Sequence, residues 1–319
     1  MTALLLWLAR RLALGALTLL VVALLTYGIP RALFAERYHG DPVLSGTWGD
    51  LGRGFLHFDW GVACGWPGCP PIQAMFARGF AADLWLIGGG LVLGVAAGLL
   101  GAMWCARRPR TRRARAVDAL ATATYCTPVY VFGLLLILMF NSKFGVVGVP
   151  AFFDANPEWA EPWTDPWLWF KVLAVPWLVL AAPLAAMCLR MTFALLREEA
   201  DAPHVRTAIA KGVAPRRVMS RHVAPPAYTQ MASFIGVTTP LIVLNLILVE
   251  WVFAVPGFFI NMQRATGKVL DINGNPVTDI AMIQAISMWS AVLIVVLGIV
   301  VDVALVGLDP RIRSGSLPG

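Results

Sequence analysis

Long uncharged apolar runs alternate with short polar segments along this chain of 319 residues. Several runs are long enough to cross about 30 Å of hydrocarbon at about 1.5 Å of helix per residue. Strands of a membrane barrel would be shorter and would alternate in polarity, so the pattern predicts an all-α membrane protein with six transmembrane helices. The predicted spans are residues 12–28, 84–105, 117–140, 167–189, 232–253 and 280–305.

The composition agrees with a membrane location. Hydrophobic residues make up 59% of the chain and charged residues only 13%, and a soluble core does not need such long uncharged runs. Arg10 and Arg11 precede the first apolar run, as in a secretory signal, but no small-residue cleavage site follows. We therefore expect this run to remain as a span, and we interpret residues 1–319 as a single transmembrane domain.

Basic residues are concentrated in alternate polar segments. Six arginines lie between Arg107 and Arg115, and seven Lys or Arg residues lie between Arg190 and Arg221. The positive-inside rule places these segments and both termini in the cytoplasm and the alternate segments outside, and all six spans agree with it. Nucleic-acid binding is the rival interpretation of the first arginine run, but a basic run between two membrane spans is far more often a topology determinant.

The polar segment 198–227, between the fourth and fifth spans, has the pattern of a docking element. Pro203 and Pro215 each stand near a predicted helix start, and Gly212 stands where the first helix needs a left-handed end. Such short helices are marginal in water by themselves, so we expect a helix, a glycine and a second helix held by another surface. A basic loop attracted to anionic lipid headgroups is the alternative interpretation.

Motifs of nucleotide hydrolysis and of familiar hydrolases are absent. The chain has no G-x-x-x-x-G-K-[ST] loop, no G-x-S-x-G elbow and no H-E-x-x-H motif. We therefore expect that the chain is not itself an enzyme and binds no cofactor or metal. His204 and His222 lack carboxylate companions, so we interpret them as surface hydrogen-bonding groups and not as metal ligands.

Ionisable residues are few in the spans. Asp83 and Asp118 lie at predicted span starts, Glu250 lies near the outer end of the fifth span, and Asp302 lies near the inner end of the sixth. An ion-driven carrier usually buries carboxylates near the middle of the membrane. We therefore interpret these four residues as interfacial caps or ion-pair partners, with a transport site as the alternative.

Glycines and prolines inside the spans indicate how the helices pack. Gly90, Gly94 and Gly98 repeat every four residues, so we expect close helix packing within the chain, with a subunit interface as the alternative. Prolines inside other spans are interpreted as helix kinks whose unpaired carbonyls are satisfied by neighbours or by a water-lined cavity. These prolines are Pro128, Pro176, Pro183 and Pro240.

Cysteine placement suggests one disulfide. Cys64 and Cys69 flank a Gly-Trp-Pro-Gly turn in a segment assigned to the outside, so a small disulfide-closed loop is one interpretation and two free thiols are the other. Cys105, Cys126 and Cys188 lie in or beside spans and are interpreted as small apolar residues.

Five sequence motifs occur in an order that resembles a known family. The docking element contains Val205-Arg-Thr-Ala-Ile-Ala-Lys-Gly212, followed by Arg217-Val and Arg221-His-Val. It resembles the cytoplasmic loop of the dipeptide/oligopeptide-type permease subunits of bacterial ABC importers, where it takes the place of the E-A-A-x-x-x-G loop. The other motifs are Gly40-Asp-Pro42, Phe58-Asp-Trp-Gly61, Val249-Glu-Trp-Val-Phe-Ala-Val-Pro-Gly257 and Leu308-Asp-Pro-Arg-Ile-Arg313.

The resemblance implies a multi-pass permease subunit of the bacterial inner membrane that moves peptides or similar small solutes. It implies as partners a second homologous permease subunit, two cytoplasmic ATPase subunits that hold ATP and Mg²⁺, a solute-binding protein and membrane lipid, and no nucleic acid. Segment 198–227 would be the coupling loop, with apolar residues Val205, Ala208, Ile209 and Val213 available to bury one face. The expected coupling residues are Val205, Arg206, Thr207, Ala208, Ile209, Lys211, Gly212, Arg216, Arg217 and Arg221.

The sequence also departs from the family pattern. Ile209 stands where a basic residue is common, and Pro225-Pro226 replaces an ordinary helical continuation, so we expect a kink at that end of the coupling loop. Residues 267–278 look inserted and contain Asn273-Gly274, which predicts an outward β-hairpin.

Two other functions are compatible with the residues alone: an ion-coupled carrier or channel acting by itself, and a membrane scaffold that recruits a cytoplasmic partner. The sequence does not distinguish peptides from nickel chelates or oligosaccharides as the solute.

Overall fold

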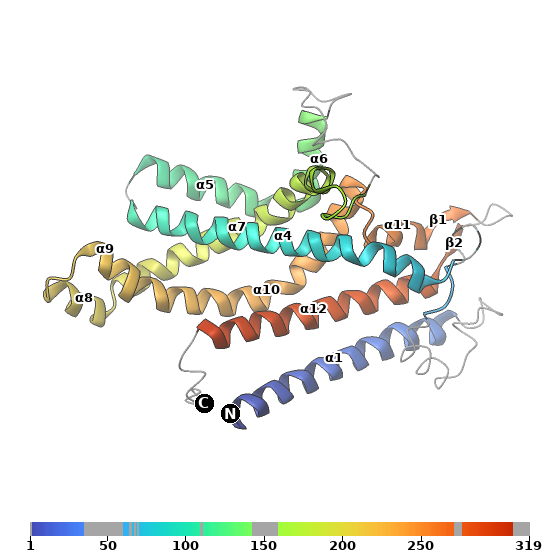
Figure 1. Ribbon diagram of the computed structural model, residues 1–319, viewed down its shortest axis with the longest axis horizontal. Coiled ribbons are helices and arrows are strands. Elements are labelled where there is room, and N and C mark those ends of the chain that lie inside the picture. Colours follow the sequence, from blue (N-terminus) through green and yellow to red (C-terminus); the bar gives the residue numbers. More distant parts are fainter. Residues whose placement is uncertain are drawn as a thin grey trace. The chain divides into compact units, whose positions relative to one another are not determined.

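Helices make up nearly all of the regular structure in the computed structural model of the chain (Figure 1). The structure describes residues 2–34, 60–63, 66, 68, 70–108, 111–141, 159–270 and 276–308. The α-helices are α1 (Thr2–Phe34), α4 (Ile72–Arg107), α5 (Arg112–Cys126), α6 (Val129–Phe140), α7 (Pro166–Ala200), α8 (Pro203–Ala210), α9 (Pro215–Val218), α10 (Ala224–Phe253), α11 (Met262–Ala265) and α12 (Ile280–Leu308). The other elements are a π-helix η1 (Met219–Val223), a 3-10 helix η2 (Phe259–Asn261), and strands β1 (Thr266–Leu270) and β2 (Pro276–Thr278).

Four helices among the described residues are long and apolar enough to cross a membrane by themselves: α1, α4, α7 and α12. The number rises to six if each of two bent helix pairs counts as one span. Each predicted span therefore corresponds to one long helix or to one bent pair. The predicted all-α class is confirmed, with the β1–β2 pair as its small exception.

The predicted span 117–140 is not one continuous helix. α5 ends at Cys126, Thr127 has extended backbone angles (φ −86°, ψ 124°), and α6 runs at 106° to α5. Pro128 explains the break, because proline disfavours helical geometry in the residue before it and has no N–H to donate. Pro128 was expected to kink one helix, but it separates two helices. By contrast, Pro176 and Pro183 lie inside the continuous helix α7.

Side-chain caps explain where α5 and α7 begin. The Thr111 hydroxyl accepts a hydrogen bond from the Ala114 N–H at 3.2 Å. Asp165 Oδ1 accepts one from the Leu168 N–H at 3.0 Å, and Pro166 occupies the first helical position. Both arrangements satisfy backbone donors that a helix start leaves without an intrahelical acceptor.

The described chain falls into two compact units: Met1–Trp85 with Ala254–Val296, and Leu86–Phe253 with Leu297–Gly319. In the first unit, Asp83 is fully buried and joins three segments. Its Oδ1 accepts a hydrogen bond from the Phe258 N–H at 2.9 Å, and its Oδ2 accepts one from the Trp289 indole N–H at 2.8 Å. Since α4 begins at Ile72, Asp83 lies about three turns inside this helix and not at its first residue.

The same unit contains the predicted hairpin. β1 and β2 pair antiparallel, with Val269 opposite Val277 and Leu270 opposite Pro276. The predicted turn at Asn273-Gly274 lies outside the described residues. An extended segment with a turn-forming Asn-Gly pair therefore did predict the two strands correctly.

In the second unit, the glycine repeat of α4 packs against α7. A Cβ added at Gly90 would lie 2.7 Å from Leu180, one at Gly94 would lie 2.8 Å from Leu184, and one at Gly98 would lie 2.4 Å from the Cβ of Cys188. These separations are shorter than real Cβ contacts, so the two helices approach closely only because these positions lack side chains. The expectation of close packing within the chain is confirmed.

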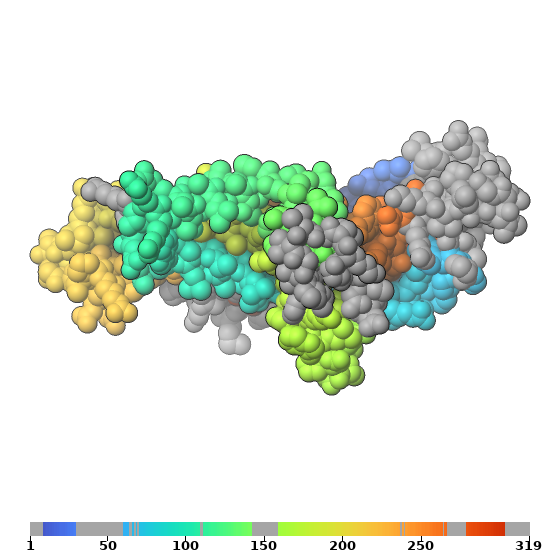
Figure 2. All heavy atoms as spheres, turned by 90° about the horizontal axis from the view of Figure 1, so that it is seen from above, coloured from blue at the N-terminus to red at the C-terminus, as the bar shows by residue number. Residues whose placement is uncertain are grey.

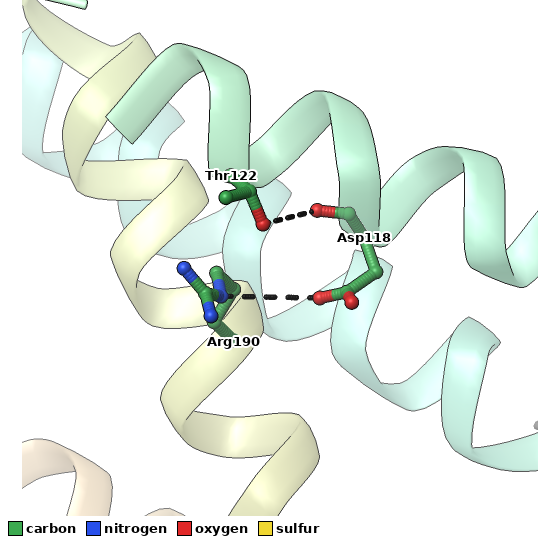
Figure 3. Close-up of polar contacts among 3 residues, drawn as sticks. All are labelled: Asp118, Thr122 and Arg190. Atoms are coloured by element: carbon green, nitrogen blue, oxygen red, sulfur yellow. Dashed lines mark hydrogen bonds and ion pairs between the residues drawn. The ribbon is translucent and has the colours of Figure 1, made fainter. Parts of the chain in front are cut away.

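An ion pair joins α5 to α7 in this unit (Figure 3). Arg190 Nε lies 3.9 Å from Asp118 Oδ1, and the Thr122 hydroxyl donates to the Asp118 carbonyl at 2.9 Å. The ion-pair interpretation of Asp118 is confirmed. Both charged side chains are nearly half exposed, so the pair contributes at most about 1 kcal/mol.

The candidate disulfide residues Cys64 and Cys69 lie outside the described residues. Their flanking residues are close: Val62 forms an antiparallel bridge with Pro71, and the Ala63 N–H donates to the Pro70 carbonyl at 2.9 Å. The disulfide itself stays a prediction.

Candidate functional site

The candidate docking element begins with the short helix α8. Ala202 has extended backbone angles, and Pro203 takes the first helical position, where its missing N–H costs nothing. The helix is eight residues long, too short to be stable in water by itself. In Figure 1, α8 and α9 lie together beyond the ends of α7 and α10, so packing against these longer helices holds the element.

Gly212 ends α8 as predicted. Its φ is +75°, a left-handed value that favours glycine. The Gly212 N–H donates to the Ile209 carbonyl at 2.9 Å, and the Val213 N–H donates to the Ala208 carbonyl at 3.2 Å. These are the two hydrogen bonds of a Schellman motif, which stops a helix and sets the direction of the next residues.

The second helix of the element, α9, does not continue directly into α10. α9 covers one turn, and the backbone then widens into the π-helix η1, in which the Ala224 N–H donates to the Met219 carbonyl. Pro225 and Pro226 follow directly and have no N–H for the normal helical ladder. The kink expected at this proline pair is therefore observed as a π-helical turn before α10.

One histidine links the two halves of the element. His204 Nε2 lies 3.2 Å from the carbonyl oxygen of His222, which connects α8 to η1. This contact agrees with the interpretation of His204 as a hydrogen-bonding group. No group of three or more His, Cys, Asp or Glu side chains within metal-binding reach occurs in the described part of the chain.

The inner face of α8 is buried in the chain's own core. Val205 is 1% exposed and Ala208 is 7% exposed. They belong to a cluster, called here the coupling core, that receives residues from α4, α7, α9, η1 and α10. Its fully buried members are Ala102, Leu196, Val205, Ala208, Val218, Val223, Ala224 and Ala227.

This burial shows which of the expected apolar residues remain available to a partner. Val205 and Ala208 contact the rest of this chain and have little surface to offer a partner. Val213 is partly buried and packs on the same core. Ile209 is 58% exposed, so it is the large apolar side chain of the predicted set that remains available.

The outer face of the element is basic. Residues 203–223 contain no acidic residue, and their Lys and Arg side chains are all exposed. Thr207 and Gly212, in the same segment, are also exposed. Figure 2 shows this segment, in gold, projecting beyond the neighbouring helices of its unit. The exposed basic residues are Arg206, Lys211, Arg216, Arg217 and Arg221.

Sequence reasoning missed the residues that support the element. Leu196 of α7, just before the element in the sequence, and Ala102 of α4, far from it, complete the coupling core. Gln230 of α10 also donates to Glu199 of α7 at 3.4 Å. The sequence shows that the ends of these helices are apolar. It does not distinguish the apolar residues that pack on α8 from those that lie in the membrane.

The geometry therefore defines a class of protein: a multi-span membrane protein that presents a basic, internally anchored helix at one end of its helices. Residues 94–314, more than half of the chain, match the family described as the binding-protein-dependent transport system inner membrane component. The chain belongs to this family. It is accordingly a multi-pass protein of the bacterial inner membrane.

Individual relatives agree with this assignment. The chain is 29% identical over 200 residues to the probable peptide ABC transporter permease protein y4tP of Sinorhizobium fredii, an alignment that covers 62% of this chain and 58% of that protein. It is 28% identical over 249 residues to the oligopeptide transport system permease protein OppB of Mycobacterium tuberculosis, covering 76% and 73%. It is 26% identical over 247 residues to the glutathione transport system permease protein GsiC of Escherichia coli K12, covering 76% and 72%.

The alignment with the first of these relatives spans less than two thirds of that relative's length. All three alignments nevertheless agree with the resemblance found in the sequence motifs. The recognition of a binding-protein-dependent permease family is thus confirmed.

Proposed function

We propose that this chain is the permease subunit of an ATP-driven importer that carries peptides into the cytoplasm. The observation that carries the proposal is the construction of α8, with one face fixed in the coupling core and the other face basic and exposed. The names of the relatives, which refer to peptide, oligopeptide and glutathione transport, support peptides as the solute class.

The proposed mechanism is mechanical. A second permease subunit completes the pathway, a solute-binding protein delivers the peptide from outside, and two ATPase subunits bind ATP and Mg²⁺ in the cytoplasm. Closure of the ATPases moves α8, and the coupling core passes the movement to α4, α7 and α10 because α8 packs directly on their ends. This chain supplies no step of ATP hydrolysis.

The exposed face determines how the ATPases are recognised. Ile209 is placed to fill an apolar pocket of the ATPase, and a buried apolar anchor of this kind carries much of the energy of an interface. Arg206, Lys211, Arg216 and Arg217 are exposed in the same element and would favour an acidic rim on the ATPase. Charges at a rim mainly affect the association rate and its salt dependence.

One pair of substitutions on α8 tests the docking face. Ile209→Asp places a charge on the exposed face and should leave the chain folded while reducing retention of the ATPases about tenfold or more. Val205→Asp places the same charge on the buried face and should destabilise the permease itself, because the core offers no described partner for a carboxylate. Detergent-purified complexes report both effects as ATPase-to-permease ratio and as melting temperature.

Purification of the native complex tests the function as a whole. Co-isolation of a second permease and of ATPases, with peptide uptake that requires ATP and the binding protein, is the expected result. Uptake by this chain alone in liposomes would instead identify a carrier or channel. An assembled complex with no solute flux would identify a scaffold. Either of these results would overturn the proposal.

A further inference from the structure

A cavity of about 320 Å³ opens on the second unit beside the break between α5 and α6. It is named here the mid-span recess. The break, α7 and α10 all contribute to its lining, and no charged side chain lines it in the part of the chain that the structure describes. Its polar lining consists of Tyr125, Thr127, Thr238 and Asn245.

The mid-span recess lies at the depth of the membrane core. Pro183 of α7 and Thr238 of α10, which both line it, are close to the midpoints of their helices. Two spans are irregular beside it: α5 and α6 meet at 106°, and α10 bends by 59° between Gly236 and Pro240.

Irregular backbone at membrane depth is tolerated where protein buries it or where it lines a water-filled cavity. This chain does not bury the break, because Tyr125 is 53% exposed. Leu241, across the recess on α10, is 55% exposed. The open side of the mid-span recess therefore suits contact with another subunit or with a water-filled path better than contact with hydrocarbon.

The threonine hydroxyl groups of the recess are left as hydrogen-bond acceptors. The Thr127 hydroxyl donates to the Ala123 carbonyl at 2.8 Å, and the Thr238 hydroxyl donates to the Ile235 carbonyl at 2.9 Å. A hydroxyl has one hydrogen, so both oxygens have only lone pairs left for a further partner.

Donors lie beside these acceptors. α6 begins at Val129, which lines the recess, and no side chain caps this helix. The first N–H groups of a helix have no acceptor within it. The Asn245 amide provides both a donor and an acceptor, and it makes no hydrogen bond to any other described residue.

We propose that the mid-span recess binds a peptide bond of the solute as it crosses the membrane. A peptide bond is neutral, donates one hydrogen bond and accepts another, which matches a recess with acceptors from two threonines, donors at a helix start and no charged side chain. No acidic side chain lines the recess to pair with a free ammonium group, and burial of an unpaired charge is strongly unfavourable. This inference rests on the proposed function, since it requires that peptides pass through the chain.

The test uses the complete importer in proteoliposomes, with the binding protein saturated. Trialanine and a trialanine methylated at both peptide nitrogens are the two probes, because methylation removes the N–H donors. The wild-type complex should transport trialanine about two- to tenfold faster, the range expected for one neutral hydrogen bond. Thr127→Val and Thr238→Val should each lower transport of trialanine by a similar factor and remove most of the difference between the probes.

Matched controls separate recognition from structure. Thr122→Val on α5 and Thr229→Val on α10 each remove the same kind of hydroxyl-to-backbone bond, to Asp118 and Pro225 respectively, and neither residue lines the recess. Both controls should preserve the wild-type preference for trialanine.

The outcomes distinguish this inference from the proposed function. A wild-type complex that transports neither probe would contradict the proposed function itself. A complex that transports both probes but whose Thr127→Val and Thr238→Val variants keep the wild-type preference would overturn only the recess. Equal slowing of both probes in these variants would assign the threonines to helix geometry and would likewise overturn peptide-bond recognition.

Discussion

Gly212→Pro should leave the permease inserted in the membrane and yet uncouple ATP hydrolysis from transport. Gly212 has a φ of +75°, whereas proline holds φ near −65°. Proline also disfavours helical geometry at Lys211, the residue before it. The chain would therefore leave α8 in a different direction, and the exposed face of the helix would no longer meet the ATPase in its proper orientation.

The size of the effect follows from two hydrogen bonds. Proline removes the 2.9 Å bond from Gly212 to Ile209 directly, and the changed φ breaks the 3.2 Å bond from Val213 to Ala208. At about 0.5–1.5 kcal/mol each, the loss is about 1–3 kcal/mol. Gly212→Ala is milder: its Cβ would meet nothing within 4 Å, so only the left-handed strain of about 1–2 kcal/mol applies. Gly212→Asn should cost least, because asparagine tolerates this conformation.

The assay is peptide-stimulated ATP hydrolysis and uptake by the reconstituted complex. Activity should fall in the order Gly, Asn, Ala, Pro at position 212. Gly68→Ala is the matched control, since Gly68 also has a positive φ (+79°) and open space around its Cβ but lies in a predicted outward loop. Normal ATP stoichiometry in Gly212→Pro would show that segment 205–213 is not the coupling element.

Three further predictions concern topology, the outer loop and helix packing. Single cysteines at Arg110 and Arg216 should be shielded from an impermeant thiol reagent in intact cells, and those at Asn156 and Asn273 should react; strong labelling at 216 would reverse the arrangement. Cys64 and Cys69 should form a disulfide with a stabilisation at the low end of about 2–4 kcal/mol, which mass spectrometry of the unreduced peptide can detect; two thiols that alkylate without reduction would disprove it. Gly98→Ala should destabilise the protein by about 1–3 kcal/mol, because its Cβ would lie 2.8 Å from the Ala185 backbone oxygen, whereas Gly88→Ala has open space; equal melting temperatures would contradict the packing argument.

Local chemical signals predicted well where several helices and strands start and end. Pro203 and Gly212 set the start and end of α8 because each acts through its own backbone geometry, which needs no knowledge of the rest of the fold. The same holds for the strands on either side of Asn273-Gly274. The close approach of α4 and α7 at Gly94 was predictable because a missing side chain matters in any helix contact.

Properties that depend on distant residues were predicted less well. Apolar spacing shows that one face of α8 is buried, but it does not show whether this chain or a partner buries it, and only the structure shows that this chain buries Val205. The helix around Asp83 starts earlier than the apolar run does, so the run did not show that Asp83 lies inside a helix. The break at Pro128 exceeded a kink because the residue before the proline took extended angles, which a hydropathy pattern cannot report.

The two sites described in the second unit share their supporting helices. α7 contributes Leu196 to the coupling core and Pro183 to the mid-span recess, about 20 Å apart along the helix at about 1.5 Å per residue. α10 contributes Ala227 to the core and Thr238 to the recess in the same way. α7 is continuous between its two sites, whereas α10 bends close to its recess residue. A movement of α8 would therefore reach the recess along α7 as a rigid displacement and along α10 as a change at its bend, so the geometry of the recess would change whenever the coupling core moves.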